Sequence, residues 1–184
     1  MVNVCIIGAG SLCKYIIEII ETSIDYKVIG IYDDYKSTND NIFGYPILGK
    51  VIQLSLGYSN IVIGIGEPKN RKDFFLYYKN KGFSFPNIIH NSAQISGRCI
   101  LGEGNIIGPS SIIQSESILG NGICLMANVV INQNVIIKDY ALIGSGAIIG
   151  NNAEIGIGAH IGLGAKIQMN EIINNWDYIN QQNI

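Results

Sequence analysis

Basic residues are sparse in this chain and never gather into a run. The 184 residues include 12 Lys and Arg against 14 Asp and Glu, so the formal net charge is −2. Proteins that bind nucleic acid through its phosphates carry a basic patch or stripe. We therefore expect no nucleic-acid partner.

Long apolar runs are also missing. No stretch approaches the roughly 20 apolar residues that a membrane-spanning helix needs. The segment from Met1 to Gly8 lacks a basic region and reaches glycine too early for a signal peptide. We expect a soluble cytoplasmic protein with no membrane partner.

The chain has no cysteine or histidine pattern typical of a metal site. Cys5, Cys13, Cys99 and Cys124 are scattered, with no Cys-x-x-Cys pair and no nearby histidine. This spacing indicates neither a zinc site nor a disulfide framework. We predict buried free thiols and no bound metal.

What the chain does contain is a six-residue repeat. Every sixth residue from 95 to 173 is aliphatic: Ile95, Leu101, Ile107, Ile113, Leu119, Leu125, Ile131, Ile137, Ile143, Ile149, Ile155, Ile161, Ile167 and Ile173. The residue two places earlier is mostly alanine, serine, cysteine or valine, with Asn105, Ile123 and Glu171 as exceptions. This period fits neither a helix nor a long strand, but it predicts a solenoid of short strands joined by tight corners. Such solenoids often host acyl transfer.

The chain before the repeat has a different pattern. We predict strands at 4–7, 26–32, 60–65 and 84–89, and helices at 12–22 and about 68–81. Alternating strands and helices indicate a small parallel α/β sheet. Because the period changes near His90, we place a Rossmann-like α/β domain at 1–89 and an all-β solenoid domain at 90–184.

Two polar turns follow predicted strands of the first domain. Glycines at 8 and 10 would let backbone N–H groups approach a phosphate at a helix N-terminus. Cys13 replaces the third glycine of the dinucleotide fingerprint, which argues against NAD. A plain tight turn here, and a solvated turn at Asp33-Asp34, are the alternatives. Since both turns and Gly66 fall on the carboxyl edge of one sheet, we favour a nucleotide-shaped ligand.

Four segments stand in order along the chain: Ile6-Ile7-Gly8-Ala9-Gly10, Ile31-Tyr32-Asp33-Asp34, Ile63-Gly64-Ile65-Gly66 with Arg71 downstream, and Asn87-Ile88-Ile89-His90-Asn91-Ser92-Ala93 leading into the hexapeptides. This arrangement resembles the sialic-acid and bacillosamine type of sugar O- or N-acetyltransferases over nearly the whole chain. The resemblance implies that the first domain holds a UDP-, dTDP- or GDP-linked amino sugar. It also implies a left-handed β-helix that forms a homotrimer and binds acetyl-CoA between subunits.

The same resemblance assigns binding residues. The nucleotide-linked sugar is expected at Gly8, Gly10, Ser11, Asp33, Asp34 and Gly66. The pantetheine arm of acetyl-CoA is expected beside Gly144, Ser145, Ala147 and Gly162, because small residues let a ligand approach the backbone.

The family's histidine base is missing at its usual place. In the hexapeptide register, Gln133 stands at the histidine position, Asn134 at the acidic position and Leu142 at that of a second histidine. Leu12 likewise replaces a histidine that often follows the glycine-rich turn. A general base contributes about 10²–10⁴-fold, which an amine nucleophile needs less than a hydroxyl does. We therefore expect N-acetylation, with Gln133 or Asn134 positioning the amine or relaying a proton through water. In the alternative, both amides only cap a corner of the solenoid.

His160 lies one coil of eighteen residues after Leu142, about 4.8 Å along the axis at sheet spacing. It is a candidate relocated base, or else an outward-facing residue beside Glu154 and Lys166. We expect His90, at the domain junction, to make a structural hydrogen bond.

The C-terminal segment departs from the family's Gly-x-Pro-Ala-like tail. We expect residues 170–178 to form a cap, helical or otherwise, with Trp176 over the last coil. In the alternative, the chain is the first part of a longer multifunctional protein.

The sequence thus predicts a trimeric, acetyl-CoA-dependent N-acetyltransferase acting on a nucleotide-linked 4-amino-4,6-dideoxy sugar for a surface glycan. A sugar O-acetyltransferase is one alternative. A catalytically inactive nucleotide-sugar-binding or scaffold protein is the other.

Overall fold

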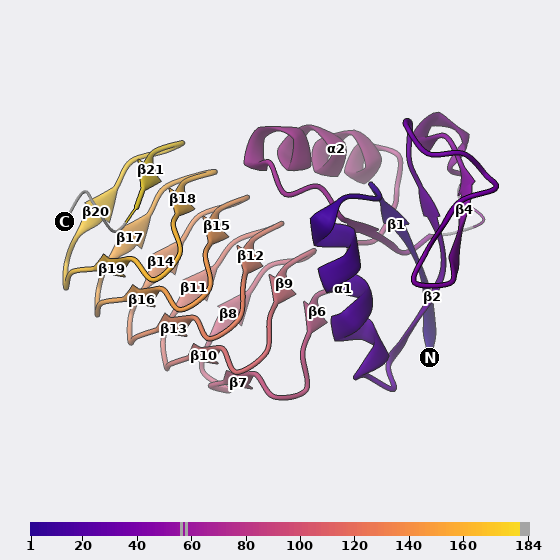
Figure 1. Ribbon diagram of the computed structural model, residues 1–184. Helices are drawn as coiled ribbons and strands as arrows, with labels where there is room; N and C mark the ends of the chain where they lie inside the picture. Colours follow the sequence, from indigo (N-terminus) through magenta and orange to yellow (C-terminus); the bar gives the residue numbers. More distant parts are fainter. Residues whose placement is uncertain (56, 58, 181–184) are drawn as a thin grey trace. The chain divides into compact units, whose positions relative to one another are not determined.

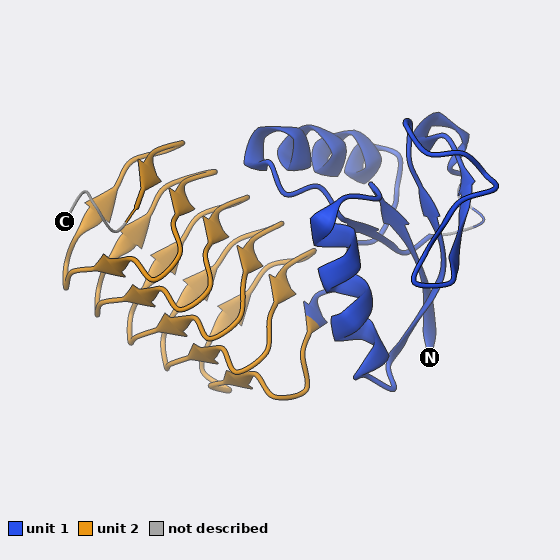
Figure 2. Cartoon of the chain, in the orientation of Figure 1, with its two compact units in different colours: residues 1–88 blue, residues 89–184 orange. Residues whose placement is uncertain are grey.

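The computed structural model describes residues 1–55, 57 and 59–180. Two compact units divide the chain, Met1–Ile88 and Ile89–Ile184 (Figure 2). Within the described ranges, no helix combines the length and apolar character that crossing a membrane requires.

The first unit is a five-stranded sheet with helices. Its strands are β1 (Val2–Ile7), β2 (Tyr26–Tyr32), β3 (Asn41–Ile42), β4 (Tyr45–Gly49) and β5 (Ile61–Ile63). Its helices are α1 (Ser11–Glu21), the short 3₁₀ helix η1 (Val51–Gln53) and α2 (Pro68–Asn80). The strand order is β3-β4-β2-β1-β5, and only β3 runs antiparallel to its neighbour. The predicted Rossmann-like α/β fold is confirmed, with two strands that were not predicted, the parallel β4 and the antiparallel edge strand β3.

The apolar face of α1 explains how this helix packs. Ile16, Ile17, Ile19 and Ile20 are all buried, as the sequence pattern predicted. Burying a side chain of this size stabilises a fold by about 1.5–3 kcal/mol.

The predicted strand at 84–89 was wrong. The chain forms only an isolated parallel bridge between Asn60 and Ser84, and then a two-residue strand β6 (Ile88–Ile89). Pro86 lies between them, and proline has no N–H to donate to a sheet.

The second unit is a left-handed parallel β-helix built from two-residue strands in three sheets (Figure 1). The first sheet contains β7 (Gln94–Ile95), β10 (Ile112–Ile113), β13 (Val130–Ile131), β16 (Ile148–Ile149) and β19 (Lys166–Ile167). The second contains β8 (Ile100–Leu101), β11 (Ile118–Leu119), β14 (Ile136–Ile137), β17 (Glu154–Ile155) and β20 (Ile172–Ile173). The third contains β6, β9 (Ile106–Ile107), β12 (Cys124–Leu125), β15 (Leu142–Ile143), β18 (His160–Ile161) and β21 (Tyr178–Ile179).

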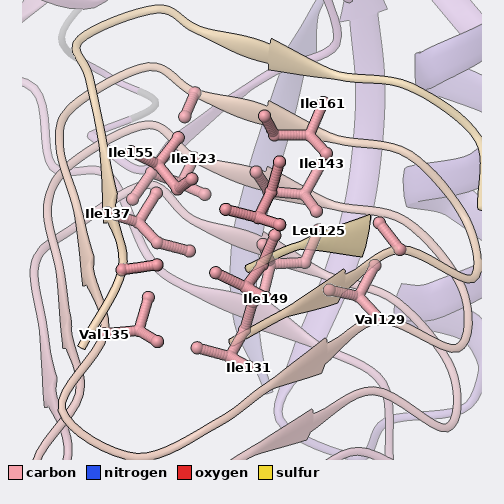
Figure 3. Packing of buried hydrophobic residues seen from close by; sticks show 14 of the residues in the cluster. Ile123, Leu125, Val129, Ile131, Val135, Ile137, Ile143, Ile149, Ile155 and Ile161 are labelled. Carbon is pink, nitrogen blue, oxygen red and sulfur yellow. The ribbon is translucent and has the colours of Figure 1, made fainter. Parts of the chain in front are cut away.

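The predicted aliphatic residues form the core of this β-helix. Each is the second residue of its strand and pairs with the equivalent residue one coil away, as Ile131 does with Ile149. From Ile107 to Ile173 they are buried and pack in one continuous cluster (Figure 3). The stack predicted from the six-residue period is confirmed.

Three polar residues are buried at the mostly small position that lies two residues before each aliphatic residue of the repeat. Ser111 Oγ donates to Met126 O at 2.9 Å and accepts from Val129 N at 3.3 Å. Ser117 makes the equivalent pair of bonds, and Asn105 Oδ1 accepts from Ile123 N at 2.8 Å. Each polar side chain therefore satisfies backbone groups of the next coil, which removes the cost of its burial.

From Leu101 onward, each corner of the coil has a left-handed residue three places after the aliphatic one. The φ angle is positive at Gly104, Ser110, Glu116, Gly122, Asn128, Asn134, Tyr140, Gly146, Asn152, Gly158, Gly164, Asn170 and Trp176. Glycine and asparagine dominate because they adopt this conformation at least cost.

The expected C-terminal cap is instead two further strands of the coil. β20 and β21 continue their sheets through Ile179, so no helix forms at 170–178. Trp176 occupies a left-handed corner, and its ring lies where a Cβ on Gly158 would stand. The six-residue pattern overrides the expected change of structure because each new strand finds a partner strand one coil earlier.

Candidate functional site

A cavity of about 560 Å³ lies in the first unit, beyond the carboxyl ends of β1, β2 and β5. All six residues predicted to bind a nucleotide-linked sugar line it: Gly8, Gly10, Ser11, Asp33, Asp34 and Gly66. Sequence reasoning therefore placed them correctly on one edge of one sheet. Their role as ligand contacts stays a prediction.

Two glycines let the walls of this cavity come together. Gly8 has a φ of +93°, and a Cβ there would lie 3.0 Å from Cγ1 of Ile65. A Cβ on Gly64 would lie 3.0 Å from Cγ2 of Ile6 and 3.2 Å from the Cα of Cys13. Gly64 thus provides the close contact between helix and strand for which the dinucleotide fingerprint uses its third glycine. The sequence pattern placed Gly64 after a strand but gave no sign of this packing role.

Asp33 ties the glycine turn to the loop after β2. Its Oδ2 accepts the Ala9 N–H at 2.8 Å, and its Oδ1 accepts the N–H groups of Tyr35 and Lys36 at 2.8 and 2.9 Å. These bonds fix the shape of the cavity wall. Asp33 is therefore a structural tie as well as a lining residue.

Asp34 is less constrained than Asp33. It is exposed, and its Oδ1 accepts one bond, from Val51 N at 2.9 Å. The Lys50 ammonium donates to the backbone carbonyl of Asp34, which holds the loop from its outer side. This arrangement leaves Asp34 the better placed of the two carboxylates to meet a ligand hydroxyl.

The two helices of this unit begin differently. The N-terminus of α1 opens on the cavity at Gly10, Ser11 and Leu12, and among the described residues no side chain caps it. At α2, the carboxylate of Glu67 accepts the Asn70 N–H at 2.8 Å. Helix N-termini attract anions through free N–H groups and the helix dipole. The α1 end therefore suits a phosphate.

The buried thiols take no part in this chemistry. Cys5, Cys13 and Cys124 are buried and Cys99 is half-buried; all four are free, as predicted. Burial raises the pKa of Cys5 and of Cys13 to about 12, so both stay protonated at neutral pH.

Gln133 lies in a surface pocket of the β-helix of about 440 Å³. Its polar lining consists of Gln94, Ser96, Gln114, Ser115 and Gln133, and the described residues that line it include no titratable side chain. This pocket can donate and accept hydrogen bonds, but it cannot supply a base near neutral pH.

Asn134 forms the neighbouring corner. Its φ is 59°, and its N–H donates to Ser115 O at 3.2 Å, one coil earlier. Its backbone therefore forms a corner of the coil, and the role of its side-chain amide stays a prediction.

His160 does not join Gln133 and Asn134 within one chain. It pairs with Leu142 in the third sheet, one coil away as predicted, whereas Gln133 follows β13 of the first sheet. Its ring meets Tyr178 edge-on, with ring centroids 4.6 Å apart. Within one chain, His160 therefore lies on a different side of the coil from Gln133 and Asn134, and the catalytic role of each residue stays a prediction.

The residues expected near acetyl-CoA lie in successive corners after the third sheet. Gly144 and Gly162 stack one coil apart, and a Cβ on Gly144 would stand 2.8 Å from the Gly162 carbonyl carbon. Ser145 lies between them in sequence, and its carbonyl accepts the Gly164 N–H at 2.9 Å. The side chain of Ala147 is 0% exposed and belongs to the core, so only its backbone could meet a ligand, and that contact stays a prediction.

His90 makes the structural hydrogen bond predicted for it. Its Nδ1 accepts the Ser92 N–H at 3.0 Å and lies 2.8 Å from Ser92 Oγ, which in turn accepts Ser110 N–H at 2.9 Å.

Comparisons with known proteins agree with this architecture. Residues 3–77 match the family described as the PglD N-terminal domain, and no curated protein gave a match. A perosamine N-acetyltransferase from Caulobacter crescentus, with one histidine replaced by asparagine and in complex with CoA and GDP-perosamine, is 24% identical with a TM-score of 0.92. That alignment covers 97% of this chain and 85% of the other.

Two further structures are similar. The acetyltransferase domain of PglB from Neisseria gonorrhoeae, in complex with acetyl coenzyme A, gives a TM-score of 0.77 at 21% identity, over 98% of this chain and 97% of that domain. WeeI from Acinetobacter baumannii gives a TM-score of 0.76 at 18% identity, over 98% of this chain and 97% of WeeI. Residues 3–77 therefore match the PglD N-terminal domain family, and the chain as a whole has the fold of these acetyltransferase structures.

Proposed function

We propose that this protein is an acetyl-CoA-dependent N-acetyltransferase for a nucleotide-linked 4-amino-4,6-dideoxy sugar, working in the cytoplasm. The observation that carries the proposal is the cavity at the uncapped start of α1, where six residues from three loops meet, in a chain that also contains a β-helix. The similar perosamine enzyme, in complex with CoA and GDP-perosamine, supports the substrate class.

In the proposed reaction, the free amine of the sugar attacks the carbonyl carbon of the acetyl thioester. A C–N bond forms, the C–S bond breaks, CoA leaves as a thiolate, and the nitrogen loses its proton to water. Correct placement of the two reactants lowers the barrier by about 7 kcal/mol or more in favourable cases. Gln133 and its neighbouring amides and hydroxyls offer hydrogen bonds to position the amine, but no base.

The perosamine enzyme is relevant to the missing base. Its variant with histidine replaced by asparagine is in complex with both CoA and GDP-perosamine. Binding of CoA and GDP-perosamine by that enzyme therefore does not require that histidine. This supports a chain in which Gln133 stands at a histidine position and both ligands still bind.

We also propose that the active form is a homotrimer. Exposed isoleucines lie on the outer face of two sheets, with Ile112 and Ile148 on the first and Ile100 and Ile118 on the second. Rows of exposed apolar side chains mark contact surfaces between proteins. A trimer would bring a third-sheet face and a first-sheet corner of different subunits within reach of one substrate.

A thiol-release assay tests the proposal. The protein is mixed with acetyl-CoA and a panel of UDP-, dTDP- and GDP-linked 4-amino sugars, with the matching 4-hydroxy sugars as controls. We expect turnover with at least one amine and none with the alcohols. Turnover with alcohols would instead support the O-acetyltransferase. Nucleotide-sugar binding without any turnover would support the second candidate, an inactive binding protein. The lack of a titratable side chain in the pocket around Gln133 is the observation that favours this candidate.

A further inference from the structure

Arg71 is buried but is not part of the cavity lining. This residue on α2 is 1% exposed, and its Nη1 donates to the carbonyl of Ile65 at 3.0 Å and to that of Gly66 at 2.7 Å. Both carbonyls belong to the loop after β5, and both residues line the cavity. A buried guanidinium therefore lies on the inner side of this loop.

The direction of the two carbonyls fixes the direction of two amides. In a trans peptide group the C=O and the N–H point opposite ways. Because the carbonyls of Ile65 and Gly66 point at Arg71, the N–H groups of Gly66 and Glu67 point away from it, toward the cavity. Neither N–H donates to any group in the part of the chain that the structure describes.

Space and charge at this position also suit an anion. A Cβ on Gly66 would meet nothing within 4 Å, so the surface above the loop is open. The nearest acid, Glu67, directs Oε2 to the N–H of Asn70 at the start of α2. Successive backbone N–H groups form concave sites for anions, and a fixed positive charge behind them strengthens such a site.

We propose that Arg71 is a positioning residue, which turns the N–H groups of Gly66 and Glu67 into the cavity to hold a phosphate of the nucleotide-linked sugar. This inference rests on the proposed function for the identity of the ligand. The two amides and the N-terminus of α1 line the same cavity, so together they can hold both phosphates of a diphosphate.

Proline at position 67 tests the amide directly. Glu67 has a φ of −68° and a ψ of 120°, which proline adopts without strain. Glu67→Pro removes both the N–H and the carboxylate, whereas the matched Glu67→Ala removes only the carboxylate. Binding of inorganic pyrophosphate, of UDP, dTDP and GDP, and of the parent nucleosides is measured by calorimetry on the full chain.

We expect Glu67→Pro to bind pyrophosphate and the preferred diphosphate about 10-fold more weakly than Glu67→Ala, because hydrogen bonds to ions are strong. Nucleoside affinity should be equal in the two variants. Arg71→Lys should lower the diphosphate-to-nucleoside affinity ratio in the same way, and Lys72→Gln on the same helix should not. A purely structural Arg71 would lower the unfolding midpoint but leave that ratio unchanged.

If Glu67→Pro binds pyrophosphate and the nucleoside diphosphate as tightly as Glu67→Ala does, the inference is overturned and the proposed function still stands. Amide-dependent pyrophosphate binding with no nucleotide bound would keep the anion site and reject the proposed substrate. If the native protein binds neither, both proposals fail.

Discussion

At the scale of single residues, Asp33 contributes more to the stability of the first unit than its place in a polar turn suggests. One carboxylate accepts three backbone N–H groups from two segments that are far apart in sequence. Hydrogen bonds to a charged acceptor each contribute about 1.5–3 kcal/mol, and losing the acceptor leaves the donors unpaired.

Asp33→Ala should lower the free energy of unfolding by about 2–3 kcal/mol, because the part-buried Ala9 N–H loses its acceptor while the exposed N–H groups of Tyr35 and Lys36 can bond to water instead. Asp34→Ala, with one such bond, is the matched control and should cost clearly less. Urea unfolding of both variants measures the difference. Equal losses would show that the three bonds to Asp33 are not what stabilises this edge of the sheet.

Gly64 and Gly10 form a second pair at this scale. Gly64→Ala should destabilise the protein by about 1–3 kcal/mol, because the added methyl group is forced against Ile6, Gly8 and Cys13. Gly10→Ala should change little, because nothing lies within 4 Å of its Cβ position. Thermal unfolding compares the two. A stable Gly64→Ala would mean that α1 moves away from β5 at little cost.

The buried thiols predict a pH dependence. The pKa values of Cys5 and Cys13 are raised from 9.0 to about 12 in the folded protein, so folding favours the protonated thiols. Their contribution to stability is complete below pH 9, where the unfolded thiols are also protonated, and is lost as the pH rises toward 12. The unfolding midpoint measured from pH 8 to 11 should fall less steeply in Cys13→Ala than in the native chain. Identical slopes would contradict this assignment.

At the scale of structural elements, the corners of the β-helix follow rules that only the structure reveals. Asp139 Oδ1 accepts the Asn121 N–H of the previous coil at 2.8 Å, and it does so by passing over Gly120. Asn121 Oδ1 likewise lies over Gly102 and accepts the Glu103 N–H at 3.0 Å, and Asn175 Oδ1 accepts the Ile157 N–H, the residue after Gly156, at 2.8 Å. Ile157 follows Asp139 by one coil, and its side chain has no acceptor for the Asp139 N–H. The residue before Asp139 is Lys138 and not the glycine found at this place in other coils. The glycines and the polar residues of this corner therefore occur as pairs.

Asn134 can be tested as a corner residue. Its left-handed backbone costs an ordinary side chain about 1–2 kcal/mol, which glycine avoids. Asn134→Gly should therefore keep both stability and turnover, whereas Asn134→Val should lose stability by about that amount. Asn152→Gly, one coil later with φ of 59°, is the control. Loss of turnover in Asn134→Gly alone, with stability intact, would assign the amide a role beyond the corner.

At the scale of the whole molecule, the exposed isoleucines make assembly testable. We expect the protein to elute as three copies of its 20.0 kDa chain. The double variant Ile112→Glu with Ile148→Glu should dissociate it, because two charges would be buried at a contact surface. Ile24→Glu, at an 85% exposed isoleucine of the first unit, should leave the mass unchanged. Light scattering reports the mass, and a monomeric native protein would refute the trimer.

Sequence reasoning predicted the parts of this protein that depend on periodicity. The stacking of Ile131 on Ile149 follows from the six-residue repeat, and the gathering of Gly8 and Asp33 follows from parallel strands ending at one edge. The role of Arg71 was not predicted, because it depends on which way two carbonyls point. The separation of Gln133 from His160 within one chain could have been predicted from the sequence, since the two differ in their position within the eighteen-residue coil.

The constant spacing of the β-helix has a consequence for how such a chain can change. Because every coil has three equivalent sides, inserting eighteen residues would lengthen the unit and return each later side chain to its original face. Inserting six would preserve the aliphatic core equally well, yet turn everything downstream by one side. Inserted before His160, those six residues would move it from the third sheet to the first, the sheet that leads into Gln133. Insertions of six residues can therefore move outward-facing side chains from one sheet of the β-helix to the next without changing its aliphatic core.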